Sequence, residues 1–346
     1  MNSNETVIGI TMGDPGGIGP EIVVKALSDP LLRRLGKFII FGIDEQLEYA
    51  ADLIEVEPFW GVHQHEKISR DYPNRVVLAN YDDFSIPAGV REPNMISGQA
   101  SVKFCLDAIY AARAGIIDAV VTAPISKESW KKARVNFPGH TELFAQQCKC
   151  SRVAMMFTAG HIKIALATIH QGLFDIRNTF TIGRVFEPID LLNDALKNYF
   201  GVDKPKIGVA ALNPHAGESG QFGDEEIRII RPAIEMAISQ KINAFGPYPA
   251  DTLFLRAARG EFDGVVAMYH DQGMIPIKLL AFNSATNVTI GLPIIRTSPA
   301  HGTAFDIAWL GKADESSMKE AIKVAAQMAG VKKAGLDNKG RLRRRG

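Results

Sequence analysis

Short apolar runs rich in Val and Ile recur along the chain, and longer segments of mixed polarity separate them. Within those segments apolar residues return at helical spacing, for example over residues 19–26, 100–114 and 225–238. Buried strands that alternate with amphipathic helices are typical of α/β proteins with a largely parallel sheet. The pattern therefore predicts an α/β fold whose strands cover residues 7–11, 38–41, 76–78, 119–122, 153–157, 162–168, 207–211 and 265–268.

The composition is that of a globular protein, with 46% apolar and 22% charged residues. No apolar run approaches the roughly 18 residues that a membrane span needs, and the N-terminus lacks the basic start and apolar stretch of a secretion signal. Cys105, Cys148 and Cys150 are sparse and odd in number, which favours reduced thiols over a disulfide framework. We therefore expect a cytoplasmic protein with no membrane partner.

Charge is distributed unevenly along the chain. The net charge is +1, yet residues 331–346 carry seven Lys and Arg against the single acidic residue Asp337. A basic end could contact nucleic acid, but no aromatic residue is interleaved with these cations. We interpret residues 331–346 as a solvated, disordered tail and expect no nucleic-acid partner.

Three of the eight histidines follow strand-like runs directly: His170, His215 and His270. Ligands of open parallel sheets bind at the carboxyl ends of the strands, so these three side chains can converge despite their separation in sequence. Three neutral imidazoles with an open coordination position suit a catalytic Zn²⁺ or Co²⁺, and Mg²⁺ with additional waters is the alternative. His63 and His65, by contrast, lie in a polar stretch typical of a solvated loop.

Other polar segments resemble loops held against a ligand. His140 and Thr141 follow a Pro-Gly turn, where a helix N-terminus can hold an anion, although His140 could equally be a bystander of a helix cap. Asp251 is a candidate acid or metal neighbour, and Asp271 either supports His270 or only begins a turn. Cationic and amide donors for a carboxylate or phosphate are available after His270, although by spacing alone they are typical surface residues: Lys278, Asn287 and Arg296.

The Gly-rich residues 11–21 (TMGDPGGIGPE) invite a nucleotide-binding interpretation. They match neither the dinucleotide fingerprint nor a P-loop, and two prolines make the segment a rigid turn. Taken alone, this motif predicts no ligand.

Together these segments resemble the 4-hydroxythreonine-4-phosphate dehydrogenase family of pyridoxal phosphate biosynthesis. The resemblance extends to about residue 330. It is carried by residues 11–21, 122–127 (TAPISK), 138–142 (PGHTE), 213–218 (NPHAGE), 269–273 (YHDQG) and 296–298 (RTS).

The resemblance implies a role for each candidate residue. His170, His215 and His270 would bind the divalent metal, with His270 supplied by the neighbouring subunit, so that a homodimer with a shared active site is required. Asp251 and Lys278 are the candidate catalytic residues. The substrate, a small phosphorylated hydroxy acid, would be held by His140, Thr141, Lys278, Asn287 and Arg296.

Residues 300–308 are also similar to the cofactor loop of the isocitrate and isopropylmalate dehydrogenase group, which binds NAD without a Rossmann fingerprint. NAD or NADP would then contact His301, Gly302, Thr303 and Asp306. The same relationship implies two interleaved α/β domains with the active site in the cleft between them. We expect an outer domain of residues 1–130 and 285–330 that carries the cofactor loop, and a central domain of residues 131–284 that carries the metal ligands and the dimer interface.

The implied reaction is oxidation of 4-phosphohydroxy-L-threonine followed by decarboxylation to 3-amino-2-oxopropyl phosphate. A divalent cation lowers the pKa of the substrate hydroxyl, eases hydride transfer to NAD, and stabilises the enolate formed when CO₂ leaves. One departure leaves a second class of substrate open, because Trp309 stands where the family pattern has Gly. That variant resembles a branch that acts on D-threonate or D-erythronate 4-phosphate and yields dihydroxyacetone phosphate.

Two hypotheses from other functional classes remain. Three histidines with aspartates could activate water in a metal-dependent hydrolase. A non-catalytic phosphate- or metal-binding module is the other alternative. The similarity of residues 300–308 to a cofactor loop argues against both.

Overall fold

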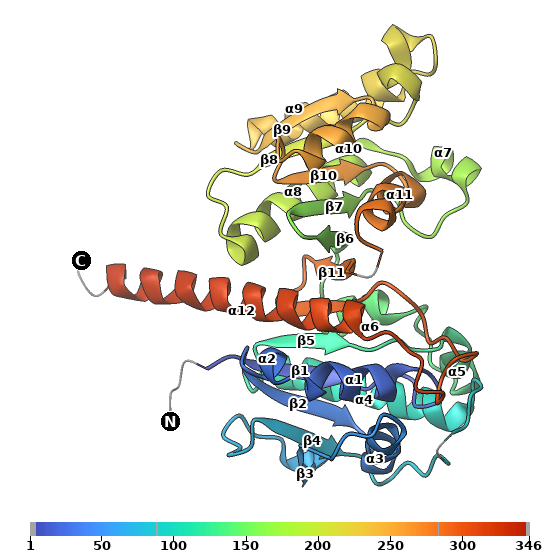
Figure 1. Cartoon of the computed structure of the whole chain (residues 1–346). Coiled ribbons are helices and arrows are strands. Elements are labelled where there is room, and N and C mark those ends of the chain that lie inside the picture. The colour runs from blue at the N-terminus through green and yellow to red at the C-terminus, as the bar shows by residue number, and fades with distance from the viewer. Residues whose placement is uncertain (1–4, 88, 283, 344–346) are drawn as a thin grey trace. The chain divides into compact units, whose positions relative to one another are not determined.

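The computed structural model describes residues 5–87, 89–282 and 284–343, with side chains up to residue 335. The chain divides into two compact units. The first unit comprises residues 1–151 and 292–330, and the second comprises residues 152–291 and 331–346. The α/β class predicted from the hydrophobic pattern is confirmed in each unit (Figure 1).

The chain crosses between the units later than the boundaries placed at residues 130 and 284. Helix α6 (His140–Gln147) belongs to the first unit because it packs on α4 (Met95–Arg113), where Arg113 donates a hydrogen bond to the carbonyl of Gln147 at 3.0 Å. Strand β11 (Thr286–Ile290) belongs to the second unit because it pairs with β6 (Ala154–Ala159). Local pairing and packing thus set both boundaries.

The strands of the first unit are all parallel and follow the order β3-β4-β2-β1-β5-β12. Four of them were predicted from apolar runs, whereas β3 and β12 were not, because β3 alternates polar residues and β12 buries Arg, Thr and Ser. The bounds are β1 Val7–Thr11, β2 Lys37–Gly42, β3 Gly61–Gln64, β4 Val76–Asn80, β5 Ala119–Thr122 and β12 Ile295–Pro299.

Helix α4 covers β1, β2 and β5, and its N-terminus is fixed by Asn94, whose side chain accepts a hydrogen bond from the backbone N–H of Ser97 at 2.8 Å. The remaining helical segments of this unit are α1 Gly19–Ser28, α2 Pro30–Arg33, α3 Asp44–Leu53, η1 His65–Lys67, α5 Lys127–Lys132 and the first part of α12, Ser316–Arg343.

The second unit has the strand order β11-β6-β7-β10-β8-β9. The last four strands are mutually parallel, as predicted, but β11, β6 and β7 pair antiparallel. For β6 and β7 the reason is local: Gly160, with φ of 57°, and His161 make a tight turn that returns β7 directly alongside β6. The remaining bounds are β7 Ile162–Leu166, β8 Lys206–Ala210, β9 Asn243–Tyr248 and β10 Gly264–Ala267.

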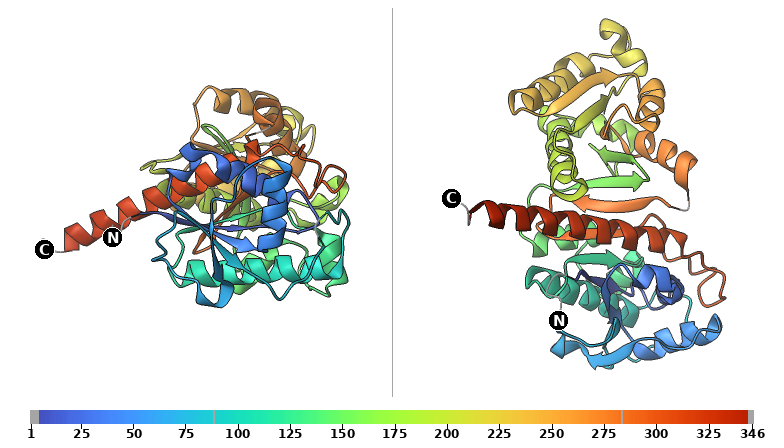
Figure 2. Two further views of the ribbon diagram at one scale, coloured as in Figure 1. Left: turned by 60° about the horizontal axis from the view of Figure 1, so that its bottom comes forward. Right: turned by 60° about the vertical axis from the view of Figure 1, so that its left-hand side comes forward.

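Helices α8 and α11 cover opposite faces of these strands (Figure 2). Helix α8 starts at the Thr181 side chain, which accepts from the backbone of Arg184, and ends at the left-handed Gly201. The helical segments are η2 Leu173–Asp175, α7 Ile176–Thr179, α8 Ile182–Phe200, η3 Pro214–Gly220, a π-helical turn η4 Glu226–Ile230, α9 Arg231–Ser239, α10 Ala250–Ala258 and α11 His270–Ala281.

The basic C-terminal segment is helical as far as Arg343, so the expectation of a disordered tail from residue 331 is wrong there; residues 344–346 lie outside the described part. The segment continues α12 without a proline, and Lys, Arg and Ala favour the helix. The three cysteines are free, as predicted. Within the described residues, every helix is too short or too polar to traverse a bilayer.

Candidate functional site

The three candidate metal ligands follow three strands of one parallel set. In the second unit β7, β10 and β8 are neighbours in that order, and His170, His270 and His215 come after them in the chain. Because parallel neighbours end at the same edge of a sheet, the loops that carry the histidines leave the sheet on one side. This strand arrangement is the one that the sequence predicted.

His170 and His270 line one pocket of about 310 Å³ in the second unit, and their ring centroids are 6.2 Å apart. The Nδ1 atom of His270 lies 2.7 Å from Oδ1 of Asp271. A carboxylate that accepts from Nδ1–H fixes the ring and leaves Nε2 free to bind a cation. Of the two roles considered for Asp271, the contact favours support of His270. The other lining residues are Ile169, Gln171, Leu173, Ile176 and Tyr269.

His215 lies in an unusual backbone segment. All five residues from His215 to Ser219 have positive φ, between 40° and 75°, and four of them carry a Cβ atom. A left-handed conformation costs about 1–2 kcal/mol for each such residue. The imidazole of His215 lies near Phe222, with 6.2 Å between ring centroids.

Within one described chain, the nitrogens of His170, His215 and His270 do not gather within the 4.8 Å that would mark a shared ion site. The resemblance assigns His270 to the neighbouring subunit, so a single chain is not expected to complete this site. The group that does meet the distance among the described residues is His65, Glu66 and Asp83 in the first unit.

The environment of His65 differs from the solvated loop that the sequence suggested. His65 is buried because its ring stacks on Tyr81 with centroids 4.1 Å apart, and its Nδ1 lies 3.2 Å from the carbonyl oxygen of Asn80. Glu66 and Asp83 are exposed. Packing and one backbone contact therefore account for His65, and nothing in the arrangement calls for an ion.

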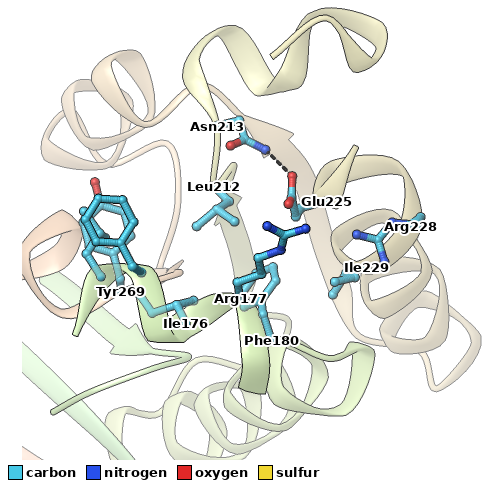
Figure 3. A pocket seen from close by; sticks show the side chains of 11 residues that line it. Ile176, Arg177, Phe180, Leu212, Asn213, Glu225, Arg228, Ile229 and Tyr269 are labelled. Atoms are coloured by element: carbon cyan, nitrogen blue, oxygen red, sulfur yellow. Dashed lines mark hydrogen bonds between the residues drawn. The ribbon is translucent and has the colours of Figure 1, made fainter. Parts of the chain in front are cut away.

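A second pocket of about 360 Å³ shares Leu173, Ile176 and Tyr269 with the histidine pocket (Figure 3). Its charged lining residues were not selected as site residues from the sequence, because none of them follows a strand: Arg177 from α7, Glu225 directly before η4, and Arg228 in η4. Glu225 accepts a hydrogen bond from Nδ2 of Asn213 at 2.7 Å. The pocket thus adjoins the loop that carries His215.

Three further candidates lie in the second unit. Asp251, in the first turn of α10, and Lys278, in the last turn of α11, are exposed. Asn287 lies in β11, and its Oδ1 is buried without a hydrogen-bond partner among the described residues. A buried acceptor of this kind is costly unless a ligand or water satisfies it.

Arg296 and His140 come together in the first unit. Arg296, in β12, is 2% exposed, donates to Oγ1 of Thr122 from Nη2 at 2.7 Å, and lies 5.8 Å from the centroid of the Phe144 ring. Burial lowers the pKa of Arg296 to about 10, which still leaves it charged at neutral pH. Burial, with the charge of Arg296 as a smaller cause, holds the pKa of His140 well below its ordinary value.

His140 is therefore a neutral imidazole at the first position of α6, with Thr141 half-buried beside it. Its Nε2 is buried and has no hydrogen-bond partner among the described residues. Its ring packs against Trp130 and Phe144. A buried cation and a neutral imidazole whose Nε2 lacks a hydrogen-bond partner among the described residues thus lie close enough to affect one another.

The candidate cofactor loop rests on the Gly-rich segment. The backbone N–H of Ile18 donates to the carbonyl of Thr303 at 2.9 Å, and a Cβ atom on Gly17 would lie 2.9 Å from Cβ of Thr303. Residues 11–21 thus support the loop closely, which explains glycine at that position. In the loop, His301, Gly302 and Asp306 are exposed and Thr303 is half-buried.

Two residues that the sequence analysis did not select hold the end of this loop. Lys25 donates from Nζ to the carbonyls of Gly311 and Ala313 at 2.9 and 2.7 Å and to Glu21 at 2.8 Å. Glu21 is 1% exposed and also accepts from the backbone of Ala313 at 2.8 Å. A glutamate among the apolar residues of an amphipathic helix was the available sign of a buried, paired charge.

Trp309 lies at the position where the resemblance led us to expect glycine. Its φ is 59°, a conformation that glycine adopts without strain, and the side chain is 5% exposed. The indole packs on Tyr49 of α3 with centroids 5.3 Å apart, and its Nε1 is buried without a hydrogen-bond partner among the described residues. The departure noted in the sequence is thus a bulky side chain buried beside the candidate cofactor loop.

Comparison with known proteins shows the family. A model described as "Pyridoxal phosphate biosynthetic protein PdxA" matches residues 35–325. The chain belongs to the PdxA family. The resemblance drawn from residues 11–21 to 296–298 is confirmed, and most of both units lies within the matched region.

Relatives of the PdxA family carry two different names at similar distance from this chain. A 4-hydroxythreonine-4-phosphate dehydrogenase of Desulforapulum autotrophicum is 44% identical over 96% of this chain and 98% of its own length. A D-threonate 4-phosphate dehydrogenase of Salmonella typhimurium is 41% identical over 93% and 98%. Among solved structures, a 4-hydroxythreonine-4-phosphate dehydrogenase of Klebsiella pneumoniae is 36% identical with a TM-score of 0.86, and covers 95% of this chain and 100% of its own.

Proposed function

We propose that this chain is a divalent-metal-dependent dehydrogenase that oxidises a small phosphorylated hydroxy acid with NAD or NADP and then decarboxylates it. The observation that carries the proposal is the placement of His170, His215 and His270 after three adjacent parallel strands. Family membership supports the dehydrogenase class.

The residues fit the proposed metal. His170, His215 and His270 would hold it, and the donor set of imidazoles suits Zn²⁺ or Co²⁺, with Mg²⁺ as the alternative. When bound, the cation would supply Lewis-acid polarisation at the substrate hydroxyl. Asp271 keeps the His270 ring in one orientation.

Five residues are the candidates for binding the substrate. The cation of Arg296 and the exposed ammonium of Lys278 would bind phosphate or carboxylate oxygens, and the buried Oδ1 of Asn287 would accept from a substrate hydroxyl or amine. His140, as a neutral imidazole, would donate or accept at the substrate without adding charge, and Thr141 would add a hydroxyl. Asp251 and Lys278 are the candidates for proton transfer.

The dinucleotide would lie against His301, Gly302, Thr303 and Asp306. NAD or NADP supplies the hydride acceptor. The support is the close fit of Thr303 on Ile18 and Gly17 and the attachment of the loop end to Glu21 and Lys25. These contacts hold the loop in place and leave His301, Gly302 and Asp306 exposed.

We further propose that the active form is a homodimer that shares each site. Helix α11 starts at His270 and exposes a row of apolar side chains, and η2 before α7 exposes two more. A group of strongly exposed apolar side chains is typical of a surface that another molecule covers. We propose a second copy of this chain as that molecule, because a second copy would also supply His270. The residues are Leu173, Phe174, Ile275, Leu279, Leu280 and Phe282, with exposures from 55% to 92%.

Two substrates are compatible with the same residues. The first is 4-phosphohydroxy-L-threonine, which would give 3-amino-2-oxopropyl phosphate. The second is D-threonate or D-erythronate 4-phosphate, which would give dihydroxyacetone phosphate, and Trp309 favours it because this residue departs from the pattern of the first group. The substrates differ at carbon 2, where one carries an amine and the other a hydroxyl.

Metal dependence and the role of His215 are tested together by following NADH absorbance. Activity should disappear when a chelator removes the cation and return when Zn²⁺, Co²⁺ or Mg²⁺ is added. His215→Ala should be inactive at every metal concentration that saturates the wild type. Release of phosphate without reduction of NAD would instead support a metal-dependent hydrolase and would contradict the proposed dehydrogenase.

A further inference from the structure

Glu226 is a buried carboxylate that no step of the proposed reaction uses. It is the first residue of the π-helical turn η4 and is 1% exposed. Its oxygens face the loop that follows β8. Oε1 accepts from the backbone N–H groups of Leu212 and Asn213 at 2.8 and 2.7 Å, and Oε2 accepts from Nδ2 of Asn213 at 3.0 Å.

The loop is folded closely around this carboxylate. A Cβ atom on Gly217 would lie 2.7 Å from Oε2 of Glu226, and one on Gly223 would lie 2.6 Å from Nδ2 of Asn213. Both glycines also have positive φ, 75° and 115°. The loop therefore approaches Glu226 at Gly217, and approaches its partner Asn213 at Gly223, about as closely as a backbone can.

The left-handed run from His215 to Ser219 lies between Asn213 and Gly223, and Gly217 is its third residue. L-residues do not hold such a conformation by themselves, and consecutive ones persist only where surrounding contacts determine them. Glu226 accepts hydrogen bonds from Asn213, two residues before His215, and its Oε2 lies close to the backbone of Gly217, two residues after His215. These contacts fix the backbone on both sides of the imidazole.

We propose that Glu226 is a positioning residue for His215. It does not contact metal or substrate; it holds the left-handed turn that presents the imidazole at the edge of the sheet. This inference rests on the proposed function in which His215 binds the divalent cation. A carboxylate suits the task because it accepts several N–H bonds at once, as three donors require here.

The test is a competition titration that measures Zn²⁺ affinity of the purified full chain against a chromophoric chelator. We expect Glu226→Ala to weaken Zn²⁺ binding by about 10- to 100-fold, the range found when a residue behind a metal ligand is removed. Glu226→Gln should fall between Ala and the wild type, because its amide oxygen can still accept from Leu212 and Asn213. Glu235→Ala, an exposed glutamate on the continuing helix α9, is the matched control and should bind as the wild type does.

Amide hydrogen exchange of the metal-free protein gives a second reading that does not depend on activity. In Glu226→Ala, exchange should accelerate across residues 212–223 while strand β8, directly before them, remains protected. A defect confined to this loop shows loss of local order, whereas a general loss of protection would show that Glu226 serves only the fold and would overturn the proposal.

A double variant separates this inference from the proposed function. If Glu226 acts through His215, adding Glu226→Ala to His215→Ala causes no further loss of Zn²⁺ affinity. Wild-type affinity in both Glu226 variants, alongside weakened binding in His215→Ala, would overturn the role of Glu226 alone. Wild-type affinity in His215→Ala itself would overturn the metal site, and the proposal with it.

Discussion

The attachment of the cofactor loop to α1 leads to a quantitative prediction. Lys25 links Glu21 to the carbonyls of Gly311 and Ala313 and is 16% exposed, while Glu21 is 1% exposed. Lys25→Met keeps much of the aliphatic stem but removes all three hydrogen bonds. It leaves the carboxylate of Glu21 buried, and among the described residues the backbone N–H of Ala313 is then its remaining hydrogen-bond donor.

The expected cost follows from that burial. Removing one partner of a buried ion pair costs about 3–5 kcal/mol, because the remaining charge stays desolvated. Part of the cost should disappear in Glu21→Gln/Lys25→Met, where no charge is left unpaired. Lys323→Ala is the control: it removes a pair with Glu320 in which the lysine is 55% exposed, and such pairs contribute about 0–1 kcal/mol.

The same substitution should weaken cofactor binding. A released loop must be ordered when NAD binds, at about 1–2 kcal/mol for each residue fixed, so the KM for NAD should rise by about 5- to 30-fold for one residue. Urea unfolding measures the stability and initial rates measure KM. The reasoning is refuted if Lys25→Met matches Lys323→Ala in both quantities, or if the double variant is less stable than Lys25→Met.

Three further predictions concern the first unit. Arg296→Lys keeps the positive charge but loses the planar donors that reach Thr122. The KM for the phosphorylated substrate should therefore rise by about 10- to 100-fold, with little change in the KM for NAD. Equal rises in both KM values would contradict a role of Arg296 in binding the substrate. Because the pKa of His140 is lowered in the folded protein, the free energy of unfolding should fall by up to about 1.4 kcal/mol per pH unit as the pH drops below the unfolded pKa near 6.5. His140→Gln should lose stability less steeply with acid, as measured by unfolding curves at several pH values. Identical slopes of stability against pH in the two proteins would exclude a neutral buried ring. Gly17→Ala would press a methyl group against Thr303 and should raise the KM for NAD. Gly330→Ala is the control and should leave this KM unchanged, because nothing lies within 4 Å of the added methyl group. Equal KM values in the two variants would show that Gly17 does not hold the cofactor loop in place.

Patterns that depend on local sequence were sufficient for much of the fold. The apolar runs at residues 7–11 and 207–211 are strands β1 and β8, because fully buried parallel strands need apolar side chains on both faces. Strand β12 was missed because it contains Arg296, a cation that is buried. Its stabilising contacts come from elsewhere in the chain, and Thr122 is 174 residues away.

The candidate site could likewise be predicted only in part from the sequence. The order of strand and histidine along the chain was enough to select His170, His215 and His270, because topology places the ends of parallel strands together. The left-handed backbone at His215 could not be predicted, since Ala216, Glu218 and Ser219 have no preference for positive φ. Glu226 was missed for the same reason, because its importance lies in a backbone conformation that the residue types do not reveal.

We propose that one active site both oxidises and decarboxylates a phosphorylated hydroxy acid. The most direct test measures NADH and CO₂ in the same reaction, with 4-phosphohydroxy-L-threonine, D-threonate 4-phosphate and D-erythronate 4-phosphate compared side by side in the presence of a divalent metal. We expect equal amounts of NADH and CO₂ from at least one of them, and no product after chelation. NADH from none of the three, under conditions in which the protein is folded and loaded with metal, would contradict it.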